Sequence, residues 1–267
     1  MRIVLIRIVQ VLAGLYIIVC ILLYFYQEKL IFFPQMLEKT FQFQFDQPHE
    51  ELFIRTHDDK QLHGLLFRAQ QPKGVIFYLH GNAGSLASWG SVAKTYTDLN
   101  YDVFMLDYRG YGKSEGEIEG EEQLFDDNQA AYEEIKKRYP ERQIIILGYS
   151  IGTGMAAQLA SVNQPKLLIL QAPYYSLTDM MEHTFSFVPT FLLKYKFATH
   201  EYLKQCKMPV VIFHGKQDEV IYYGSSLKLQ QEFKSQDLLI PLDNQGHNGM
   251  TENQHYQAVM KKILAAG

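Results

Sequence analysis

The amino-acid sequence predicts an α/β protein with a mostly parallel sheet, preceded by one membrane-spanning helix. Three observations lead to this fold class. Short apolar runs alternate with helical patterns along most of the chain, an apolar stretch stands at the N-terminus, and 47% of the 267 residues are hydrophobic. That apolar fraction is enough to bury a core, and the length fits one globular domain with a short appendage.

The charge and cysteine content exclude several classes of protein. Lys and Arg number 25 against 29 Asp and Glu, a formal net charge of −4 without a block of basic residues. No electrostatic footprint for nucleic acid is therefore expected. The 2 cysteines exclude a small disulfide scaffold. His49, His57 and His63 lack the spacing of metal ligands, so neither a metal nor another cofactor is predicted.

Residues 1–34 are predicted to form a transmembrane anchor with an interfacial segment. Residues 8–26 carry no charge, and at ~1.5 Å per residue a helix of that length covers about 28 Å, close to the ~30 Å hydrocarbon core. Arg2 and Arg7 precede the stretch, and aromatic residues close it, as at a membrane interface. The alternative is a cleaved signal peptide. No small-residue cleavage site follows, so an uncleaved signal anchor is favoured.

The charges at the start of the chain predict its orientation in the membrane. Arg2, Arg7 and the α-amino group favour a cytoplasmic N-terminus. The chain is then a single-pass membrane protein, and residues 35–267 form one folded domain on the non-cytoplasmic side.

This domain is predicted to open with strands. Residues 41–46 alternate between Phe and polar residues, as a half-buried strand does. Residues 52–56 and 62–67 form two further strands, and the turn-forming segment 57–60 joins them. Because these strands are consecutive and tightly joined, we expect them to form an antiparallel edge of the sheet.

Alternating strands and helices follow, which is typical of βαβ units and a parallel sheet covered on both faces. Apolar runs predict buried strands at 75–79, 103–106, 144–147, 167–170, 210–213 and 238–242. Helical patterns lie near 86–99, 121–139, 152–162, 225–233 and 252–264.

One long connection interrupts this rhythm. The segment between Ala172 and Lys207 is rich in Met, Phe and Leu. Connections of that length are usually functional insertions in a compact domain. We expect a short helical cap, at about 173–206, over the ends of the strands. The alternative is a further core helix.

The segment Gly148-Tyr149-Ser150-Ile151-Gly152 is the sharpest chemical signal. It follows a predicted strand and leads into a predicted helix, so Ser150 would stand on a tight strand–turn–helix elbow. The flanking glycines are needed because a Cβ there would clash, and the helix N-terminus points unpaired amides at charge beside the serine. Ser150 is therefore predicted to be a catalytic nucleophile.

A serine hydroxyl needs a base, and the base needs an orienting acid. In this architecture the order along the chain is Ser, then Asp or Glu, then His. His247 lies in a Gly-rich loop after the last strand and is the predicted base. Asp218 follows the strand 210–213 and is the predicted acid, with adjacent Glu219 a weaker candidate. Other candidates lie in the cap, on a strand, beside a strand or on the last helix: His183, His200, His214, His255, Asp179, Asp237 and Asp243.

Acyl transfer also needs preorganised donors for an oxyanion. In this architecture they are two backbone N–H groups, one just after the nucleophile and one from a loop after an early strand. These positions are Ile151 and, in the loop 80–84, Asn82. A second Gly-rich loop, 107–116, lacks the spacing of a phosphate-binding motif. It is predicted to be structural, with Asp107 and Arg109 bonding to neighbouring loops.

Together these motifs resemble the α/β-hydrolase superfamily, and within it the membrane-anchored bud-emergence-type hydrolases. In this chain the N-terminal span runs into residues 27–34, Gln-Glu-Lys-Leu-Ile-Phe-Phe-Pro, and the span of those hydrolases runs into a similar stretch. The resemblance covers nearly the whole chain and implies an eight-stranded, mostly parallel sheet and serine hydrolase chemistry. At one position the chain departs from that family, because Tyr222 stands where its acid loop usually has a proline. The motifs that carry the resemblance are His80-Gly81-Asn82-Ala83-Gly84, Leu106-Asp107-Tyr108-Arg109-Gly110-Tyr111-Gly112, Gly148-Tyr149-Ser150-Ile151-Gly152, His214-Gly215 with Asp218, and Gly246-His247-Asn248.

The predicted function is hydrolysis of an ester or thioester in a lipidic or acylated substrate. The apolar cap and the anchor favour such a substrate, for example a lysophospholipid, a monoacylglycerol or an acylated protein. Expected partners are this substrate and membrane lipid, not nucleic acid. A peptidase on the same fold is the alternative, and it would need a charged subsite for a peptide terminus. A non-catalytic binding protein is a further alternative, but such chains typically lose a triad member.

Overall fold

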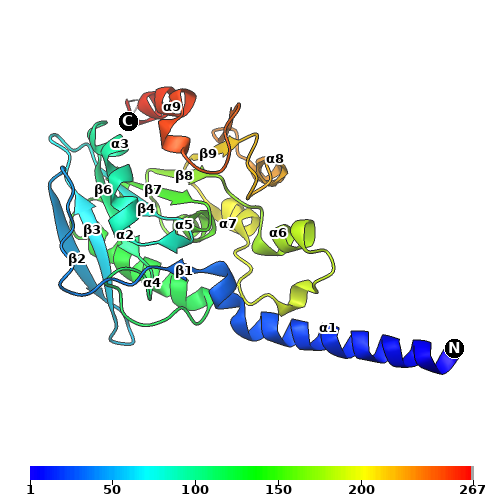
Figure 1. Ribbon diagram of the computed structural model, residues 1–267. Helices are drawn as coiled ribbons and strands as arrows, with labels where there is room; N and C mark the ends of the chain where they lie inside the picture. The colour runs from blue at the N-terminus through cyan, green and yellow to red at the C-terminus, as the bar shows by residue number, and fades with distance from the viewer. Residues whose placement is uncertain (266–267) are drawn as a thin grey trace.

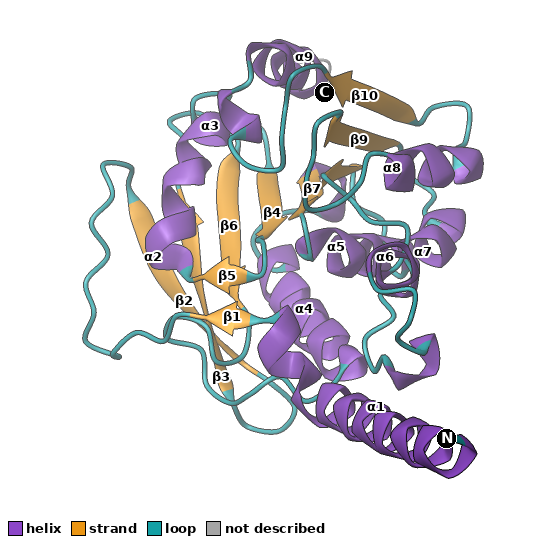
Figure 2. Cartoon of the chain, turned by 45° about the vertical axis from the view of Figure 1, so that its right-hand side comes forward, coloured by secondary structure: helices purple, strands orange, loops and turns teal. Residues whose placement is uncertain are grey.

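A computed structural model describes residues 1–265 and contains a central eight-stranded sheet (Figures 1 and 2). The strand order is β10-β9-β8-β7-β4-β6-β3-β2. Its strands are β2 (His49–Arg55), β3 (Gln61–Phe67), β4 (Val75–Leu79), β6 (Asp102–Asp107), β7 (Ile144–Tyr149), β8 (Leu167–Gln171), β9 (Val210–Gly215) and β10 (Leu238–Leu242). The β2–β3 and β3–β6 pairs are antiparallel and the others parallel, which confirms the predicted antiparallel edge.

Helices cover both faces of the sheet because side chains of a strand point alternately to its two faces. In β4, Phe77 packs in the core beneath α4, α5, α7 and α8, whereas Tyr78 packs beneath α2, α3 and α9. The helices are α2 (Leu86–Trp89), α3 (Lys94–Thr97), α4 (Glu121–Lys136), α5 (Gly152–Ser161), α7 (Thr199–Gln205), α8 (Gly224–Leu229) and α9 (Gln254–Ala265). The helix predicted over 86–99 is divided into α2 and α3 by a 3₁₀ turn, Gly90–Ala93.

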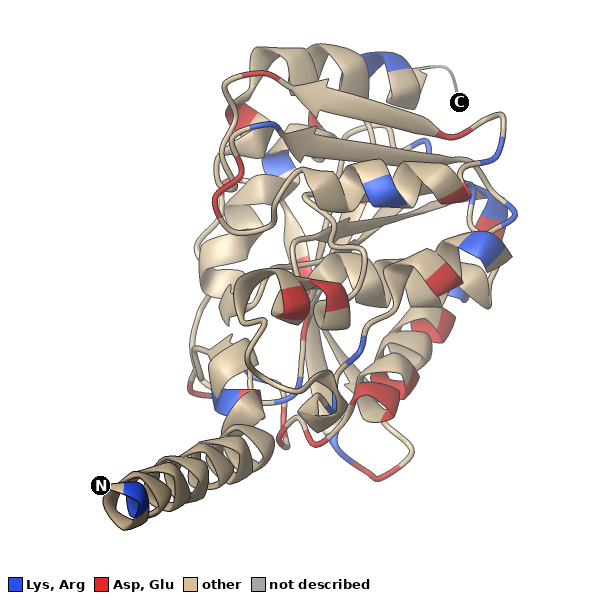
Figure 3. Cartoon of the chain, turned by 90° about the vertical axis from the view of Figure 1, so that its right-hand side faces the viewer, with Lys and Arg blue, Asp and Glu red and all other residues tan. Residues whose placement is uncertain are grey.

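The helix α1 (Arg2–Ile31) extends away from the domain (Figure 1). It is long and apolar enough to cross a membrane, and its apolar side chains are exposed along most of its length. Charged residues lie only towards its two ends (Figure 3), at Arg2 and Arg7 and again at Glu28 and Lys29. Apolar side chains on all faces are typical of a helix surrounded by lipid.

The prediction of a strand over 41–46 is wrong. The segment is extended, and its side chains do alternate between half-buried and exposed, but its backbone pairs with no strand among the described residues. Phe43 stacks on His63, and Phe45 packs edge-on against Phe67. Side chains that are buried at every second position therefore show only that this segment lies along the surface of the domain. Such alternation does not require hydrogen bonds to a neighbouring strand.

A two-stranded parallel sheet that the sequence does not reveal joins the end of the anchor to the loop after β4. It pairs β1 (Phe33–Pro34) with β5 (Ala83–Gly84). The Phe33 N–H donates to the Asn82 carbonyl over 2.8 Å. The chain that leaves α1 is thus fastened to the loop that holds the predicted oxyanion donor.

The segment between β8 and β9 contains two structurally different parts. The helix α6 (Leu177–Thr184) and the 3₁₀ turn Thr190–Leu192 stand beside α1, whereas α7 packs against α5 with Leu203 buried in the core. Figure 1 shows α6 standing out from the sheet on the side of α1, with α7 closer to the sheet. The helix α6 and the 3₁₀ turn correspond to the expected cap, and α7 corresponds to the alternative of a core helix. Below, "cap" means residues 177–193.

Candidate active site

Ser150 lies between the end of β7 and the start of α5 in a left-handed backbone conformation, with φ of +53°. Such a φ is strained for a residue with a side chain. The two glycines that flank this turn have no room for a Cβ. A Cβ on Gly148 would lie 2.5 Å from the Gly152 carbonyl oxygen, and one on Gly152 would lie 2.3 Å from the Leu79 carbonyl oxygen. The glycines thus allow the strand, turn and helix to pack closely enough to hold Ser150 on the elbow.

The three predicted triad residues lie together, although 97 positions separate Ser150 from His247 in the chain. His247 Nε2 is 3.0 Å from Ser150 Oγ, and His247 Nδ1 is 2.8 Å from Asp218 Oδ2. Because Nδ1 carries a proton and donates it in a hydrogen bond to the carboxylate, Nε2 is left as the acceptor for the serine hydroxyl. All three side chains are almost completely buried.

Contacts outside the triad hold the loop that carries His247. The Tyr149 hydroxyl donates to the His247 carbonyl over 2.8 Å, so the residue before Ser150 fixes the base loop. On the other side, the His247 N–H donates to Glu219 Oε2 over 3.3 Å. Glu219, the weaker candidate for the acid, thus contacts the backbone of His247 rather than the imidazole.

Asp218 is fixed by donors on several sides. Its Oδ1 accepts the N–H groups of Val220 and Ile221, over 2.9 and 2.8 Å. Its Oδ2 lies 3.3 Å from Nε2 of His214, which is completely buried. Burial alone would raise the pKa of Asp218, but the hydrogen bonds from His214 and His247 outweigh burial and hold this pKa well below its usual range.

His214 also belongs to this site, although the sequence predicts only a strand position for it. Its Nε2 lies 2.9 Å from the Ile221 carbonyl oxygen as well as near Asp218, so this nitrogen carries the proton. Its Nδ1 lies 2.6 Å from Ser226 Oγ. The sequence signals for His214 are its place at the end of a strand, four positions before the predicted acid, and its presence in the motif His214-Gly215 with Asp218.

The two predicted oxyanion positions lie at the ends of neighbouring strands, β4 and β7. In residues 1–265 the backbone N–H groups of Asn82 and Ile151 have no hydrogen-bond acceptor, which leaves them available to a ligand. The backbone carbonyl and the side-chain amide nitrogen of Asn82 have partners within the protein. Its carbonyl accepts from Phe33 and from the Tyr111 hydroxyl, and its side-chain amide donates to the Ile31 carbonyl over 3.2 Å.

Arg109 and Asp107 bond to neighbouring segments, as the sequence predicts. Arg109 forms ion pairs with Asp127 and Asp58, and Asp107 accepts the Leu86 N–H, so the loop 107–116 is structural. The remaining acidic and histidine candidates have contacts away from Ser150. Each is exposed or bonded to a neighbour: His183, His200, His255, Asp179, Asp237 and Asp243.

Tyr222, which replaces the usual proline of the acid loop, links that loop to the cap. Its hydroxyl donates to Asp179 Oδ2 over 2.5 Å, and its ring stacks on His183 with centroids 3.9 Å apart. Both partners belong to α6. A proline could make neither contact, so this substitution gives the cap a fixed position relative to Asp218.

Comparisons with known proteins show the family and the fold of the chain. The model of the family described as serine aminopeptidase, S33, matches residues 70–201. Protein bem46 of Schizosaccharomyces pombe is 31% identical over 74% of this chain and 72% of its own length. The lysophosphatidylserine lipase ABHD12 of Danio rerio is 32% identical over 61% of this chain, but the match spans only 47% of that protein. An esterase of Pyrococcus furiosus, Pf2001, has the same fold, with a TM-score of 0.69 and 19% identity over 88% of this chain and 97% of its own.

The fold and these comparisons define an α/β hydrolase, and the chain is a serine hydrolase. Within this superfamily it belongs to the family of the bud-emergence-type hydrolases, to which it is similar over most of its length.

Proposed function

We propose that this chain is a membrane-anchored serine hydrolase that cleaves an ester or thioester of a lipidic or acylated substrate through Ser150, His247 and Asp218. The observation that carries the proposal is the continuous pair of hydrogen bonds, 3.0 and 2.8 Å long, that connects the strained Ser150 to Asp218 through His247. This is the arrangement in which a serine hydroxyl becomes a nucleophile.

The reaction follows from the protonation states of these groups. Ser150 Oγ attacks the acyl carbon while His247 Nε2 accepts the hydroxyl proton, and the ionised Asp218 stabilises the imidazolium that forms. The N–H groups of Asn82 and Ile151 donate to the oxyanion of the tetrahedral intermediate. The imidazolium then protonates the leaving alkoxide or thiolate, and an acyl-enzyme remains. Water, activated by His247, releases the acid and restores Ser150.

Three features favour a lipidic substrate. The helix α1 is suited to cross a bilayer, the cap beside it exposes large apolar side chains, and one relative is a lysophosphatidylserine lipase. An exposed apolar surface of this kind is typical of a contact with membrane or ligand. The proposed domain division is an anchor over 1–34 and a catalytic domain over 35–267.

Competitive labelling tests the substrate class. A fluorophosphonate probe should label the full-length protein in membranes, because it reacts with an activated serine. Prior addition of a long-chain monoacylglycerol should slow this labelling, whereas an aminoacyl amide should not. Protection by the aminoacyl amide and not by the ester would replace the lipase proposal with the peptidase.

The peptidase is the second candidate, since the matching family model bears the description of a serine aminopeptidase. Glu219 is the acidic side chain in the Asp218 loop that could face a substrate amine, and it already accepts the His247 N–H. An aminopeptidase would need this carboxylate for the amine. If the chain were a non-catalytic binding protein, the fluorophosphonate probe should not label it.

The proposed localisation is a single-pass membrane protein with a cytoplasmic N-terminus and a non-cytoplasmic catalytic domain. Arg2 and Arg7 at the start of α1 support this orientation. In sealed vesicles with the cytoplasmic face outward, an added protease should leave the catalytic domain intact until detergent opens the vesicles. Digestion before detergent is added would contradict the orientation.

A further inference from the structure

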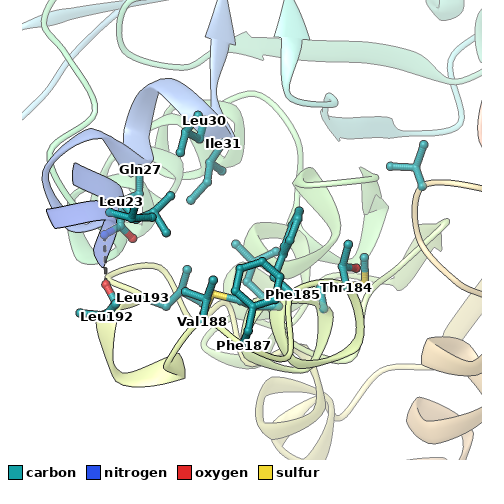
Figure 4. Close-up of a pocket in the computed structure, with 15 residues that line it drawn as sticks. Leu23, Gln27, Leu30, Ile31, Thr184, Phe185, Phe187, Val188, Leu192 and Leu193 are labelled. Carbon is teal, nitrogen blue, oxygen red and sulfur yellow. Dashed lines mark hydrogen bonds between the residues drawn. The ribbon is translucent and has the colours of Figure 1, made fainter. Parts of the chain in front are cut away.

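A pocket of about 680 Å³ lies between the anchor helix α1 and the cap (Figure 4). That volume is within the range of about 300–1,000 Å³ that is typical of small-molecule sites. Apart from Gln27 and Thr184, the described residues that line it are apolar. Figure 4 shows the α1 side chains facing those of the cap across the pocket. The α1 wall is formed by Val19, Leu23, Gln27, Leu30 and Ile31.

The α1 wall is one face of the helix, and it is held in place. Val19, Leu23 and Gln27 follow each other at intervals of four, so they lie on one side. Gln27 is buried, and its amide donates to the Leu192 carbonyl over 3.1 Å and accepts the Lys194 N–H over 2.8 Å. The anchor is therefore docked against the cap, which gives the pocket a defined shape.

The contact between Tyr16 and Phe187 indicates where the pocket lies relative to the bilayer. The Tyr16 hydroxyl donates to the Phe187 carbonyl over 2.8 Å. Tyr16 precedes Tyr26, the end of the predicted span, by about 15 Å of helix at ~1.5 Å per residue. With the span in the bilayer, the tip of the cap lies well below the interface. Its exposed Phe185, Phe187 and Phe191 are suited to that depth.

We propose that this pocket binds the acyl chain of a membrane lipid ester, and that α1 forms one wall of the substrate site as well as anchoring the enzyme. The inference rests on the proposed function, because the substrate class is that of the same catalytic site. The occupant is a fatty acyl chain because apolar side chains line the pocket and because the cap reaches the depth of the bilayer's own acyl chains.

A second pocket lies beside the first, at the loop that carries Asp218. It has a volume of about 330 Å³ and is lined by Asp218 and Glu219. Met180, Thr184 and Val220 line both pockets. In the proposal, the acyl chain held beside α1 extends past these three residues, so that its ester end lies on the side of the Asp218 loop.

The same end of α1 is connected to the oxyanion loop. The Asn82 side chain donates to the Ile31 carbonyl, and the Asn82 carbonyl accepts the Phe33 N–H. Ile31 also lines the acyl pocket. The anchor thus contacts both the proposed acyl site and the loop that carries a proposed oxyanion donor, which places it within the substrate site.

Matched tryptophan variants of full-length protein in phosphatidylcholine nanodiscs test this role of α1. Leu23→Trp fills the pocket, whereas Ile21→Trp adds the same bulk on the opposite face of the helix, where Ile21 is exposed. The kcat/KM for monooleoylglycerol is measured relative to that for p-nitrophenyl acetate. This ratio should fall roughly tenfold or more in Leu23→Trp and stay unchanged in Ile21→Trp. Val188→Trp, which narrows the pocket from the cap, should reproduce the fall. Equal ratios in the pocket variants and Ile21→Trp would overturn the proposal.

A photo-crosslinking experiment gives a result that does not depend on turnover. A monoacylglycerol with a diazirine in mid-chain is irradiated with the Ser150→Ala protein in the same nanodiscs. Adducts should map to Val19 and Leu23 and to the cap, and excess monooleoylglycerol should remove them. Adducts confined to the opposite face of α1, or adducts that do not saturate, would overturn the acyl pocket even if the enzyme hydrolyses esters. Saturable adducts in the pocket, with no ester hydrolysis by wild type, would support the pocket and contradict the proposed function.

Discussion

Replacing Ser150 with alanine is expected to lower ester turnover by a factor on the order of 10⁶ and to abolish fluorophosphonate labelling. The expectation rests on the 3.0 Å contact between Ser150 Oγ and His247 Nε2, which makes this hydroxyl the proposed nucleophile. Labelling of purified protein in nanodiscs, followed by turnover of p-nitrophenyl acetate, measures both effects.

Ser161→Ala is the matched control for this variant. Ser161 is the last residue of α5, the helix that Ser150 precedes, and its hydroxyl donates locally to the Gln158 carbonyl. It should label and turn over like wild type. Equal labelling of wild type and Ser150→Ala would show that another residue is the nucleophile, provided that both proteins unfold at the same temperature.

His247→Ala is expected to reduce kcat by a factor on the order of 10⁶, and Asp218→Asn by on the order of 10⁴. Without the imidazole, the serine proton has no acceptor. Asparagine can retain the shape of the site, but it no longer stabilises the imidazolium or selects the tautomer with the proton on Nδ1. Steady-state turnover of a short-chain ester measures both losses.

The double variant and a surface histidine control these effects. Because the three residues act as a unit, Ser150→Ala with His247→Ala should be about as slow as either single variant. His255→Ala should match wild type, since His255 is exposed on α9. Additive losses in the double variant would contradict a coupled triad, and a loss in His255→Ala as large as in His247→Ala would assign the base elsewhere.

Much of the fold could be predicted from the sequence because its signals are local. The parallel strands appear as continuous apolar runs bounded by turn residues, and each of those runs has a counterpart among β4 and β6–β10. The elbow at Ser150 could be predicted because the two glycines that it requires lie within the same five consecutive residues, 148–152. Asp218 and His247 followed from chain order and from their place after strands.

The segment 41–46 shows where local signals mislead. Its alternating Phe residues predict a strand, but alternation only records which side chains face the domain. Whether a neighbouring backbone is available to pair is decided elsewhere in the chain, and here Phe43 and Phe45 pack on side chains instead. For the same reason the short β1–β5 pair, which depends on the position of the anchor, leaves no local pattern.

The sequence by itself determined the fold class, the apolar N-terminal helix and the three candidate catalytic residues, because each depends on nearby residue types. Only the tertiary structure decided that His214 contacts Asp218, that Tyr222 links the acid loop to the cap, and that α1 docks on the cap through Gln27. The residues in these contacts come close to each other only when the sheet and its loops have packed, so no local sequence pattern can predict them. The hydrophobic residues, 47% of the sequence, thus serve three purposes: they form the core, the anchor helix and the walls of the pocket beside that helix.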